Sequence, residues 1–248
     1  MNLFKCCNKT DETKNLIEDD NIINITFISD THEQHKLVSN DLVPGDIIVH
    51  TGDFSNEESG SQNMKPVKQF LDWFSKLPYQ HKIFIGGNHD VALQNTTKFT
   101  KLLKNYPNIT YLNQASTQIS LKTQNLKFYG VPFVTRPQGM FYLNQQEQEK
   151  ALQQIEQCDI LLSHNMPYRH DLFEKRVDEL KPRIHAFGHM HGDSGICQRH
   201  ETLYINAAMV GHPGHIYKYK PIQVSITKED VKVNNIENIK VWNEFPKK

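Results

Sequence analysis

The chain has 248 residues, 38% of them hydrophobic, with 28 basic side chains balanced by 28 acidic ones. This length and composition fit one globular domain with a substantial apolar core. The balanced charge offers no general electrostatic attraction to a nucleic acid polymer or to an anionic membrane, whereas a small ligand held by local contacts remains compatible.

The polar segment 1–21 is expected to be a flexible lead-in, and residues 22–248, which contain no linker or internal repeat, to form a single domain. No run of about 20 apolar residues is present, and the N-terminal residues lack the apolar core of a secretory signal. The four cysteines follow no disulfide pattern, so we expect a soluble, cytoplasmic protein. Cys6 and Cys7 are expected to be free thiols, with palmitoylation as the alternative.

Three short, β-branched segments in the first third of the chain are typical of buried strands: residues 22–28, 46–50 and 82–85. Between the second and the third, an apolar residue recurs every three or four positions from Val67 to Leu77, which predicts an amphipathic helix. A helix between two strands favours their parallel pairing. This part of the chain therefore predicts an α/β fold.

The middle of the chain carries shorter strand-like segments at residues 109–112, 117–121 and 126–131, which are more typical of a second sheet. Asn144 and Glu147 have the spacing of a capping box and predict the start of a helix.

The last third returns to the earlier pattern. Residues 159–163 and 183–187 are predicted to be buried strands, with a helix over residues 168–180 between them. Residues 203–206 and 222–226 are predicted to complete the sheets.

Five of the predicted strands end in a turn that carries side chains able to bind a metal ion. Because the carboxyl ends of strands in an open α/β sheet converge on one crevice, we expect these side chains to lie together. All are oxygen or imidazole donors and none is a thiolate, which suits zinc, manganese or iron. Seven donors exceed the needs of one ion, whereas two ions about 3.5–4 Å apart that share one carboxylate would use them all. The seven are Asp30, His32, Asp53, Asn88, His164, His189 and His191.

These motifs resemble those of the calcineurin-like metallophosphoesterase family. The resemblance rests on five motifs in the family's order: Asp30-x-His32, Gly52-Asp53, Gly87-Asn88-His89-Asp90, His164 and Gly188-His189-x-His191. Neighbouring segments also look like the subgroup of metallophosphoesterase-domain-containing proteins, which is similar to class III cyclic nucleotide phosphodiesterases. The resemblance implies a calcineurin-like four-layer αββα sandwich, in which helices flank two mixed β-sheets.

The resemblance further implies a role for each residue, with two divalent ions (manganese, iron, zinc or cobalt) as cofactors. The first ion would be held by Asp30, His32 and His191, the second by Asn88, His164 and His189, and both by Asp53. A hydroxide bridging the ions would attack phosphorus, and His89 would be the general acid that protonates the leaving group. Asp90 would accept a hydrogen bond from the far ring nitrogen of His89 and set its tautomer.

The expected substrate is a small phosphodiester, and the resemblance extends this expectation to cyclic nucleotides. Related protein phosphatases follow the Gly-Asp motif with an Asp-Arg-Gly sequence, whose Arg binds a terminal phosphate dianion. Here Phe54, Ser55, Asn56, Glu57 and Glu58 follow Asp53, with two acidic side chains and no Arg. This local charge favours a monoanionic diester. The alternatives are a broad phosphomonoesterase and a non-catalytic scaffold that only binds partners.

Several residues near the motifs leave two readings open. Asn206 either contacts substrate or forms a structural hydrogen bond, and His50 is expected to support the Asp53 turn or to pack. Five residues either border the pocket or belong to an ordinary loop or the packed core. They are His212, His215, Phe133, Arg136 and Phe141. The other histidines outside the motifs are expected to be surface or core residues.

Overall fold

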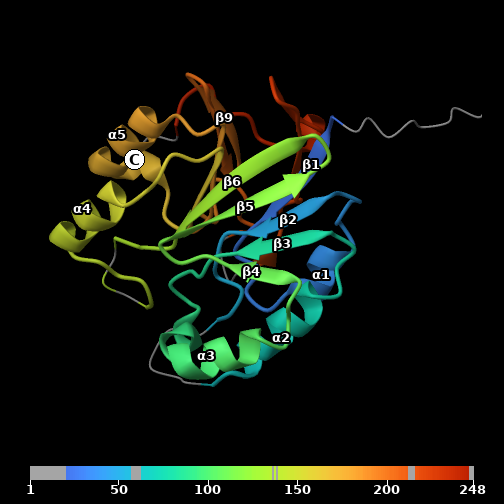
Figure 1. Ribbon diagram of the computed structural model, residues 1–248, viewed down its shortest axis with the longest axis vertical. Helices are drawn as coiled ribbons and strands as arrows, with labels where there is room; N and C mark the ends of the chain where they lie inside the picture. Colours follow the sequence, from blue (N-terminus) through green and yellow to red (C-terminus); the bar gives the residue numbers. More distant parts are fainter. Residues whose placement is uncertain (1–20, 57–62, 136, 138, 212–215, 246–248) are drawn as a thin grey trace, which may run out of the picture.

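The structure is a computed structural model that describes residues 21–56, 63–135, 137, 139–211 and 216–245 (Figure 1). Some features predicted above lie outside the described residues. They are nearly all of the 1–21 lead-in with Cys6 and Cys7, and also Glu57, Glu58, Arg136, His212 and His215.

The first of two mixed sheets contains the strands from the beginning and the end of the chain. Its strand order is β14-β13-β1-β2-β3-β4. β1 to β4 are parallel to one another, and β13 and β14 each pair antiparallel with their neighbours. The strands are β1 (Ile23–Ile28), β2 (Ile47–His50), β3 (His81–Phe84), β4 (Ile109–Tyr111), β13 (Ile222–Ile226) and β14 (Val231–Val233).

The second sheet is built from the middle of the chain, in the order β5-β6-β7-β8-β10-β9. β6, β7, β8 and β10 are parallel, and β5 and β9 are antiparallel edge strands. The strands are β5 (Ala115–Leu121), β6 (Gln124–Val131), β7 (Ile160–Ser163), β8 (Ile184–Phe187), β9 (Gly195–Arg199) and β10 (Thr202–Asn206). A short hairpin is formed by β11 (Val210–Gly211) and β12 (Ile216–Tyr217).

Helices cover the outer face of each sheet (Figure 1). The first sheet packs against α1 (His35–Ser39), α2 (Lys65–Phe74) and α3 (Thr96–Leu103), and the second against α4 (Gln145–Gln153) and α5 (Asp171–Leu180). Single 3₁₀ turns are η1 (Val91–Gln94), η2 (Pro167–Arg169) and η3 (Ile236–Asn238). The layers run helix, sheet, sheet, helix, which confirms the predicted αββα sandwich. None of the helices in the described ranges is long and apolar enough to cross a membrane.

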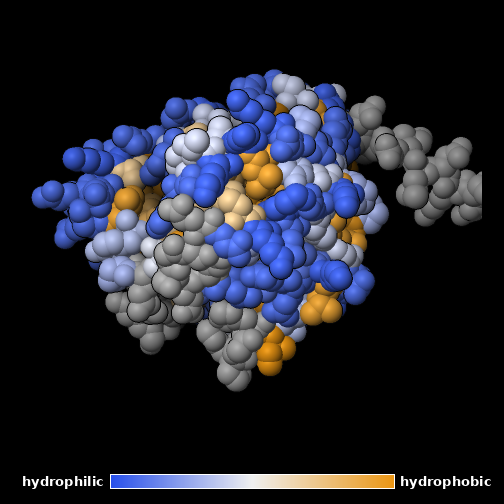
Figure 2. Space-filling model, turned by 90° about the horizontal axis from the view of Figure 1, so that it is seen from below, coloured by the Kyte–Doolittle hydropathy of each residue, from blue (hydrophilic) through white to orange (hydrophobic). Residues whose placement is uncertain are grey.

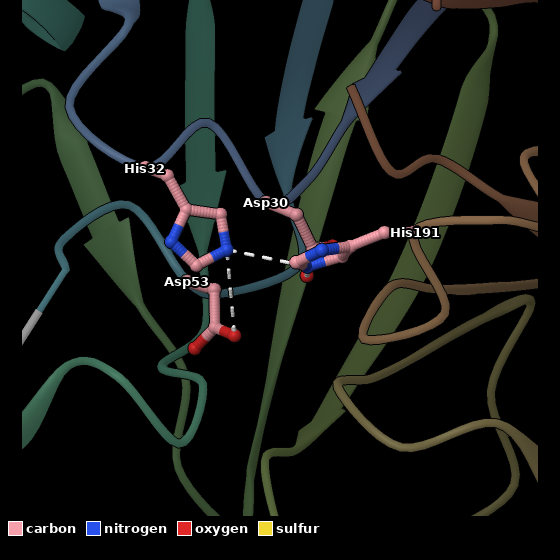
Figure 3. A group of neighbouring side chains, drawn as sticks. All are labelled: Asp30, His32, Asp53 and His191. Atoms are coloured by element: carbon pink, nitrogen blue, oxygen red, sulfur yellow. Dashed lines mark hydrogen bonds and ion pairs between the residues drawn. The ribbon is translucent and has the colours of Figure 1, made fainter. Parts of the chain in front are cut away.

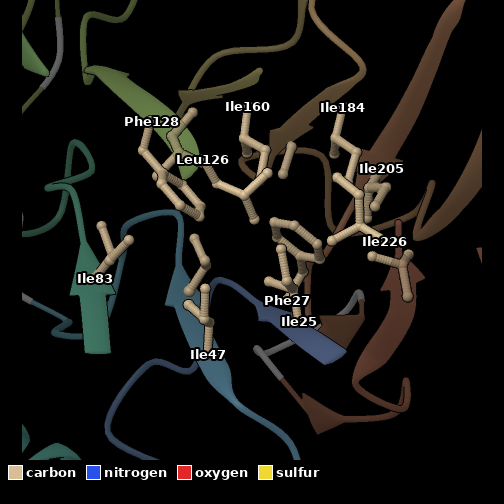
Figure 4. Packing of buried hydrophobic residues seen from close by; sticks show 14 of the residues in the cluster. Ile25, Phe27, Ile47, Ile83, Leu126, Phe128, Ile160, Ile184, Ile205 and Ile226 are labelled. Atoms are coloured by element: carbon tan, nitrogen blue, oxygen red, sulfur yellow. The ribbon is translucent and has the colours of Figure 1, made fainter. Parts of the chain in front are cut away.

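The central core lies between the two sheets (Figure 4). Ile25 and Phe27 of β1 face Ile160 and Ile184 of the second sheet, and all four are fully buried. The alternate side chains of β1 point toward the helices, where Ile28 joins the cluster under α2. Because both faces of the central strands are covered, their sequences are almost continuously apolar rather than alternating.

One predicted strand lies in a different sheet from the one expected. Residues 109–112 were expected in the second sheet, but β4 pairs parallel with β3 in the first. The connection from β3 to β4 runs through α3, a crossover helix whose one buried side chain is Phe99. The polar sequence of α3 gives only a weak helical pattern, so the crossover that places β4 is not evident from the sequence.

Replacing Phe70 with alanine should lower the free energy of unfolding by about 3–5 kcal/mol, because a large buried ring would leave a cavity under α2. Phe70 is fully buried and stacks on Phe54, with ring centroids 4.2 Å apart. Urea denaturation of the metal-free protein measures this change. As a control, Leu172→Ala on α5, where Leu172 is 41% exposed, should change it by no more than about 0.5 kcal/mol. Equal losses for both variants would contradict the packing described here.

Candidate metal centre

The predicted donor side chains lie in the turns that follow β1, β2, β3, β7 and β8. β1, β2 and β3 are adjacent and parallel in one sheet, and β7 and β8 in the other, so their carboxyl ends share one edge of the sandwich. Backbone hydrogen bonds tie the first two turns together. The Asp30 N–H donates to the Gly52 carbonyl over 2.9 Å, and the His32 N–H donates to the Asp53 carbonyl over 3.1 Å.

At several donor residues the backbone adopts a left-handed conformation, which residues other than glycine rarely take. The φ angles are +51° at Asp30, +41° at His32, +55° at Asp53 and +67° at His189. Such angles cost free energy and persist where the surrounding structure fixes them, often at functional sites. Close packing adds to the constraint, since a Cβ atom at Gly188 would meet the Asp30 carboxylate.

One group of donors consists of Asp30, His32, Asp53 and His191, all buried, with a ligand atom from each within 4.8 Å of the others. His191 Nε2 lies 3.0 Å from Asp30 Oδ1 and 3.2 Å from His32 Nε2. His32 Nε2 is 4.0 Å from Asp53 Oδ2. Figure 3 shows the His32 ring directed toward both Asp53 and His191.

A second group consists of Asp53, His164 and His189, again within 4.8 Å of one another. His164 Nε2 lies 3.1 Å from Asp53 Oδ2 and 3.1 Å from the Asn88 amide oxygen. His164 Nδ1–H donates to the Thr51 carbonyl over 2.8 Å, so the lone pair of the neutral ring is on Nε2 and faces the other donors. The structure thus brings all seven predicted donors together, and Asp53 belongs to both groups.

The pKa shifts in the two groups indicate carboxylates that require positive charge close by. Burial alone would raise the pKa of Asp30, but the hydrogen bond to His191 and the nearby imidazoles hold it well below its ordinary value. Burial alone would lower the pKa of His164, whereas the Asp53 carboxylate raises it to about 9. Burial lowers the pKa of His189 to about 4, which leaves this ring a neutral donor.

These observations fit a cation. Two buried carboxylates face imidazole nitrogens at hydrogen-bond distance, and buried carboxylates are stable only when positive charge compensates them. Carboxylate oxygens, imidazole nitrogens and the Asn88 amide are ligands that divalent transition metals accept. A divalent ion among each group would supply the charge that protons otherwise bring.

His89 and Asp90 lie beside the donors, but their predicted hydrogen bond is not present. The Asp90 carboxylate instead accepts from the backbone N–H groups of Asp53, Gly87 and Ser55 and from the Ser55 hydroxyl, over 2.8–3.1 Å. Asp90 therefore ties together the turns after β2 and β3. Its burial and the charge of Asp53 raise its pKa to about 8, although the backbone donors oppose the shift. The prediction is wrong because three backbone amides from two turns converge on the Asp90 carboxylate. The relative position of these turns is set by the tertiary structure and is not evident from sequence spacing.

The main chain of His89 is held on both sides. Its N–H donates to Asp53 Oδ1 over 2.8 Å, and its carbonyl accepts from the Ser55 hydroxyl over 2.7 Å. The His89 ring lies edge-on to the His32 ring, with centroids 5.0 Å apart. His89 thus stands next to the first donor group without belonging to either group.

Asn56 is a residue of the site that the sequence analysis did not identify. Its amide oxygen lies 2.9 Å from His32 Nδ1, and its amide nitrogen donates to the His32 carbonyl over 3.2 Å. A metal-binding histidine commonly donates its second ring N–H to such an acceptor, which fixes the tautomer. Asn56 therefore directs the lone pair of His32 Nε2 toward Asp53 and His191. The only available signal was a polar side chain three positions after Asp53.

Asn206 supports the turn that carries His189 and His191. Its amide nitrogen donates to the carbonyls of Met190 and Asp193, over 2.8 and 2.6 Å, and its amide oxygen accepts from the Ala208 N–H. Of the two readings, the structural hydrogen bond is the one observed.

Other residues with open readings serve in packing or support. His50 Nδ1 accepts from the Gly52 N–H over 3.2 Å, and the ring packs on Phe70, so it supports the Asp53 turn. Phe133 is buried and packs on Phe173, and Phe141 packs in the cluster under the first sheet.

Comparison with known proteins gives consistent matches. The model of the family described as calcineurin-like phosphoesterase matches residues 23–193. A UPF0046 protein of Caenorhabditis elegans is 27% identical over 223 residues, which cover 78% of this chain and 77% of that protein. The human metallophosphoesterase domain-containing protein 1 is 29% identical over 220 residues, which cover 73% of this chain and 64% of the human protein.

Two solved structures share the fold. A structure described as a novel phosphatase from Mycoplasma pneumoniae has a TM-score of 0.55 at 11% identity, and the match covers 87% of this chain and 92% of that one. GAP50, described as the anchor in the inner membrane complex of Plasmodium, has a TM-score of 0.55 at 13% identity, covering 88% and 89%. At these identities the likeness shows the fold alone.

Replacing Asn56 with alanine should weaken metal binding by about 10–100-fold, because the His32 ring would lose the acceptor that fixes its tautomer. Calorimetric titration of the metal-free protein with Mn²⁺ or Zn²⁺ measures the affinity. Asn56→Asp retains an acceptor oxygen and should recover most of it. If Asn56→Ala binds metal as the unaltered protein does, Asn56 has no part in positioning His32.

Proposed function

Because the chain belongs to the calcineurin-like phosphoesterase family, we propose that it is a metal-dependent enzyme that hydrolyses small phosphodiesters, with cyclic nucleotides among the candidate substrates. The observation that carries this proposal is the pair of donor groups that share the Asp53 carboxylate. Sharing of one carboxylate is typical of sites with two metal ions, which catalyse displacement at phosphorus.

The proposed cofactors are two divalent ions, chosen among manganese, iron, zinc and cobalt. Asp30, His32 and His191 would hold one, and Asn88, His164 and His189 the other, with Asp53 between them. Bound ions of this kind supply activation of water and compensation of the phosphate charge. The mixed oxygen and nitrogen donors suit these metals better than magnesium or calcium, which prefer oxygen alone.

His89 is the residue proposed to move a proton. It is next to the first donor group, and its main chain is fixed by Asp53 and Ser55. A protonated ring nitrogen there would donate its proton to the oxygen of the departing alcohol, which leaves poorly as an alkoxide. The fixed main chain keeps the ring beside the donors while the substrate binds.

The preference for a diester is supported by the residues that follow Asp53. Phe54 is buried in the aromatic cluster under α2. The Ser55 and Asn56 side chains are engaged by Asp90 and His32, so neither is positioned to bind phosphate. None of the three carries a positive charge that would compensate the second charge of a phosphate monoester.

Two alternatives remain distinct from this proposal. A broad phosphomonoesterase would use the same donors with a dianionic substrate. A non-catalytic scaffold is the other, since a structural neighbour of similar fold is described as an anchor. A scaffold has no need for seven converged donors, four of them with a strained backbone, and their presence here favours an enzyme.

The protein loaded with Mn²⁺ or Co²⁺ should hydrolyse bis-p-nitrophenyl phosphate at least about tenfold faster than p-nitrophenyl phosphate, because the described residues that follow Asp53 carry no positive charge to compensate the second charge of the monoester. Release of nitrophenolate, measured as kcat/KM, gives the comparison. The reverse order would favour the phosphomonoesterase. Absence of turnover with every metal tested, despite metal binding, would favour the scaffold.

Replacing His89 with alanine should reduce kcat on alkyl phosphodiesters by about 10²–10⁴-fold, because their leaving group requires a proton. On p-nitrophenyl esters the reduction should be much smaller, since nitrophenolate leaves without one. The exposed His200→Ala variant serves as the control and should not change either rate. Equal losses on both kinds of ester would count against an acid role for His89.

A further inference from the structure

A short segment between β6 and α4, residues 139–141, lies against the turn that carries Asn88, and we call it the clasp. Its middle residue, Met140, donates its N–H to the Asn88 carbonyl over 2.8 Å. The base of the clasp is closed by a hydrogen bond from the Val134 N–H to the Phe141 carbonyl over 2.9 Å. The clasp follows a strand of the second sheet and holds a turn of the first, so it joins the two sheets beside the metal centre.

Apolar contacts add to this attachment. The side of the molecule on which α2 and α3 lie is largely hydrophilic, and its apolar side chains form small, separate patches (Figure 2). The two apolar side chains of the clasp are instead partly buried, and Met140 and Phe141 both pack against the cluster under the first sheet. The Phe141 ring fills the space beside Gly86, where a Cβ atom would overlap it. The clasp is therefore held to the turn after β3 by packing as well as by hydrogen bonding.

Gly139 is the residue through which the clasp comes into close contact with Asn88. A Cβ atom at Gly139 would overlap the Asn88 carbonyl oxygen and would lie 3.1 Å from Asn88 Cβ. The φ angle of Gly139 is +77°, a left-handed value that glycine adopts without strain. A larger residue at this position would therefore force the clasp and the Asn88 turn apart.

Asn88 is the predicted donor that depends most on the position of its own main chain. It is the one amide among the seven donors, and it is partly exposed, whereas five of the other six are buried. In the part of the chain that the structure describes, its side chain makes one hydrogen-bonding contact, with His164 Nε2 over 3.1 Å. A neutral amide oxygen attracts a cation less strongly than a carboxylate does, so its contribution requires that its position be fixed.

We propose that Gly139 is a positioning residue for the second metal ion. Its close contact with the Asn88 main chain, together with the Met140 hydrogen bond, holds the Asn88 amide oxygen toward His164, where that ion would bind. This role rests on the proposed function, because it requires a second ion. The donors that belong to the first ion alone come from the turns after β1 and β8, and the clasp holds neither of these turns but the one after β3.

Calorimetric titration of the metal-free protein with Mn²⁺ tests this role. In Gly139→Ala the affinity for one of the two ions should fall by about 10–100-fold, because a group that orients a ligand is displaced, while the affinity for the other should change by less than about twofold. Electron paramagnetic resonance gives a second readout, since two neighbouring Mn²⁺ ions produce a coupled spectrum. That spectrum should appear in Gly139→Ala only at a higher Mn²⁺ concentration than in the unaltered protein.

Further variants identify the ion concerned. Asn88→Ala should weaken the same ion, and Gly139→Ala should cause no further loss once Asn88 is alanine, because both changes act through one ligand. Gly139→Asn separates backbone strain from contact. Asparagine adopts positive φ angles more readily than alanine, yet its Cβ still meets Asn88, so it should weaken the ion as alanine does. Gly192→Ala is the matched control, since a Cβ at Gly192 meets nothing within 4 Å, and it should leave both affinities unchanged.

Several results would overturn the proposal. They are unchanged affinity for both ions in Gly139→Ala, equal weakening of both ions, or a full additional loss when Gly139→Ala is combined with Asn88→Ala. Equal weakening would mean that the clasp supports the fold as a whole and not Asn88 in particular. Binding of a single ion by the unaltered protein would instead overturn the two-ion function proposed above, and the role of Gly139 with it. The unaltered protein therefore distinguishes a failure of the proposed function from a failure of this role alone.

Discussion

The contact of Asp53 with two groups of imidazoles is the interaction on which the rest of the site depends. One carboxylate, almost fully buried, lies 3.1 Å from His164 and 4.0 Å from His32, and it also accepts the N–H of His89. A buried carboxylate in such surroundings is stable only if positive charge is nearby, as protons on the rings or as bound cations. The backbone at Asp53 is itself strained, with φ at +55°, so the surrounding fold holds this residue in a conformation that it would otherwise rarely adopt.

The sandwich supplies that constraint. Adjacent parallel strands of both sheets end at one edge, and the turns beyond them are tied to one another by backbone hydrogen bonds and by buried polar side chains. Asp90 joins the turns after β2 and β3, and Asn206 holds the turn after β8. The donors are therefore positioned by turns that hydrogen bonds hold together, which is the arrangement that a metal site with fixed geometry requires.

The sequence predicted most of this arrangement, because its signals are local. A buried strand followed by Asp or His in a turn can be read from a few residues, and the parallel topology then brings the turns to one edge. The sheet to which β4 belongs was not predictable, since strand pairing depends on contacts far apart in the sequence. The partners of Asp90 and the role of Asn56 also escaped, because side-chain direction within a turn is set by the tertiary structure. The αββα fold is confirmed, while metal-ligand roles for the seven donors remain predictions.

Family membership and the geometry of the donor groups are two separate observations that support a metal-dependent function. The fold is shared by proteins with different roles, whereas the converged donors belong to this chain. The most direct test of the account is anomalous diffraction from crystals grown with Mn²⁺. It should show two ions per chain, about 3.5–4 Å apart, each with an oxygen of Asp53 among its ligands. A single ion, or two ions of which only one contacts Asp53, would contradict the account.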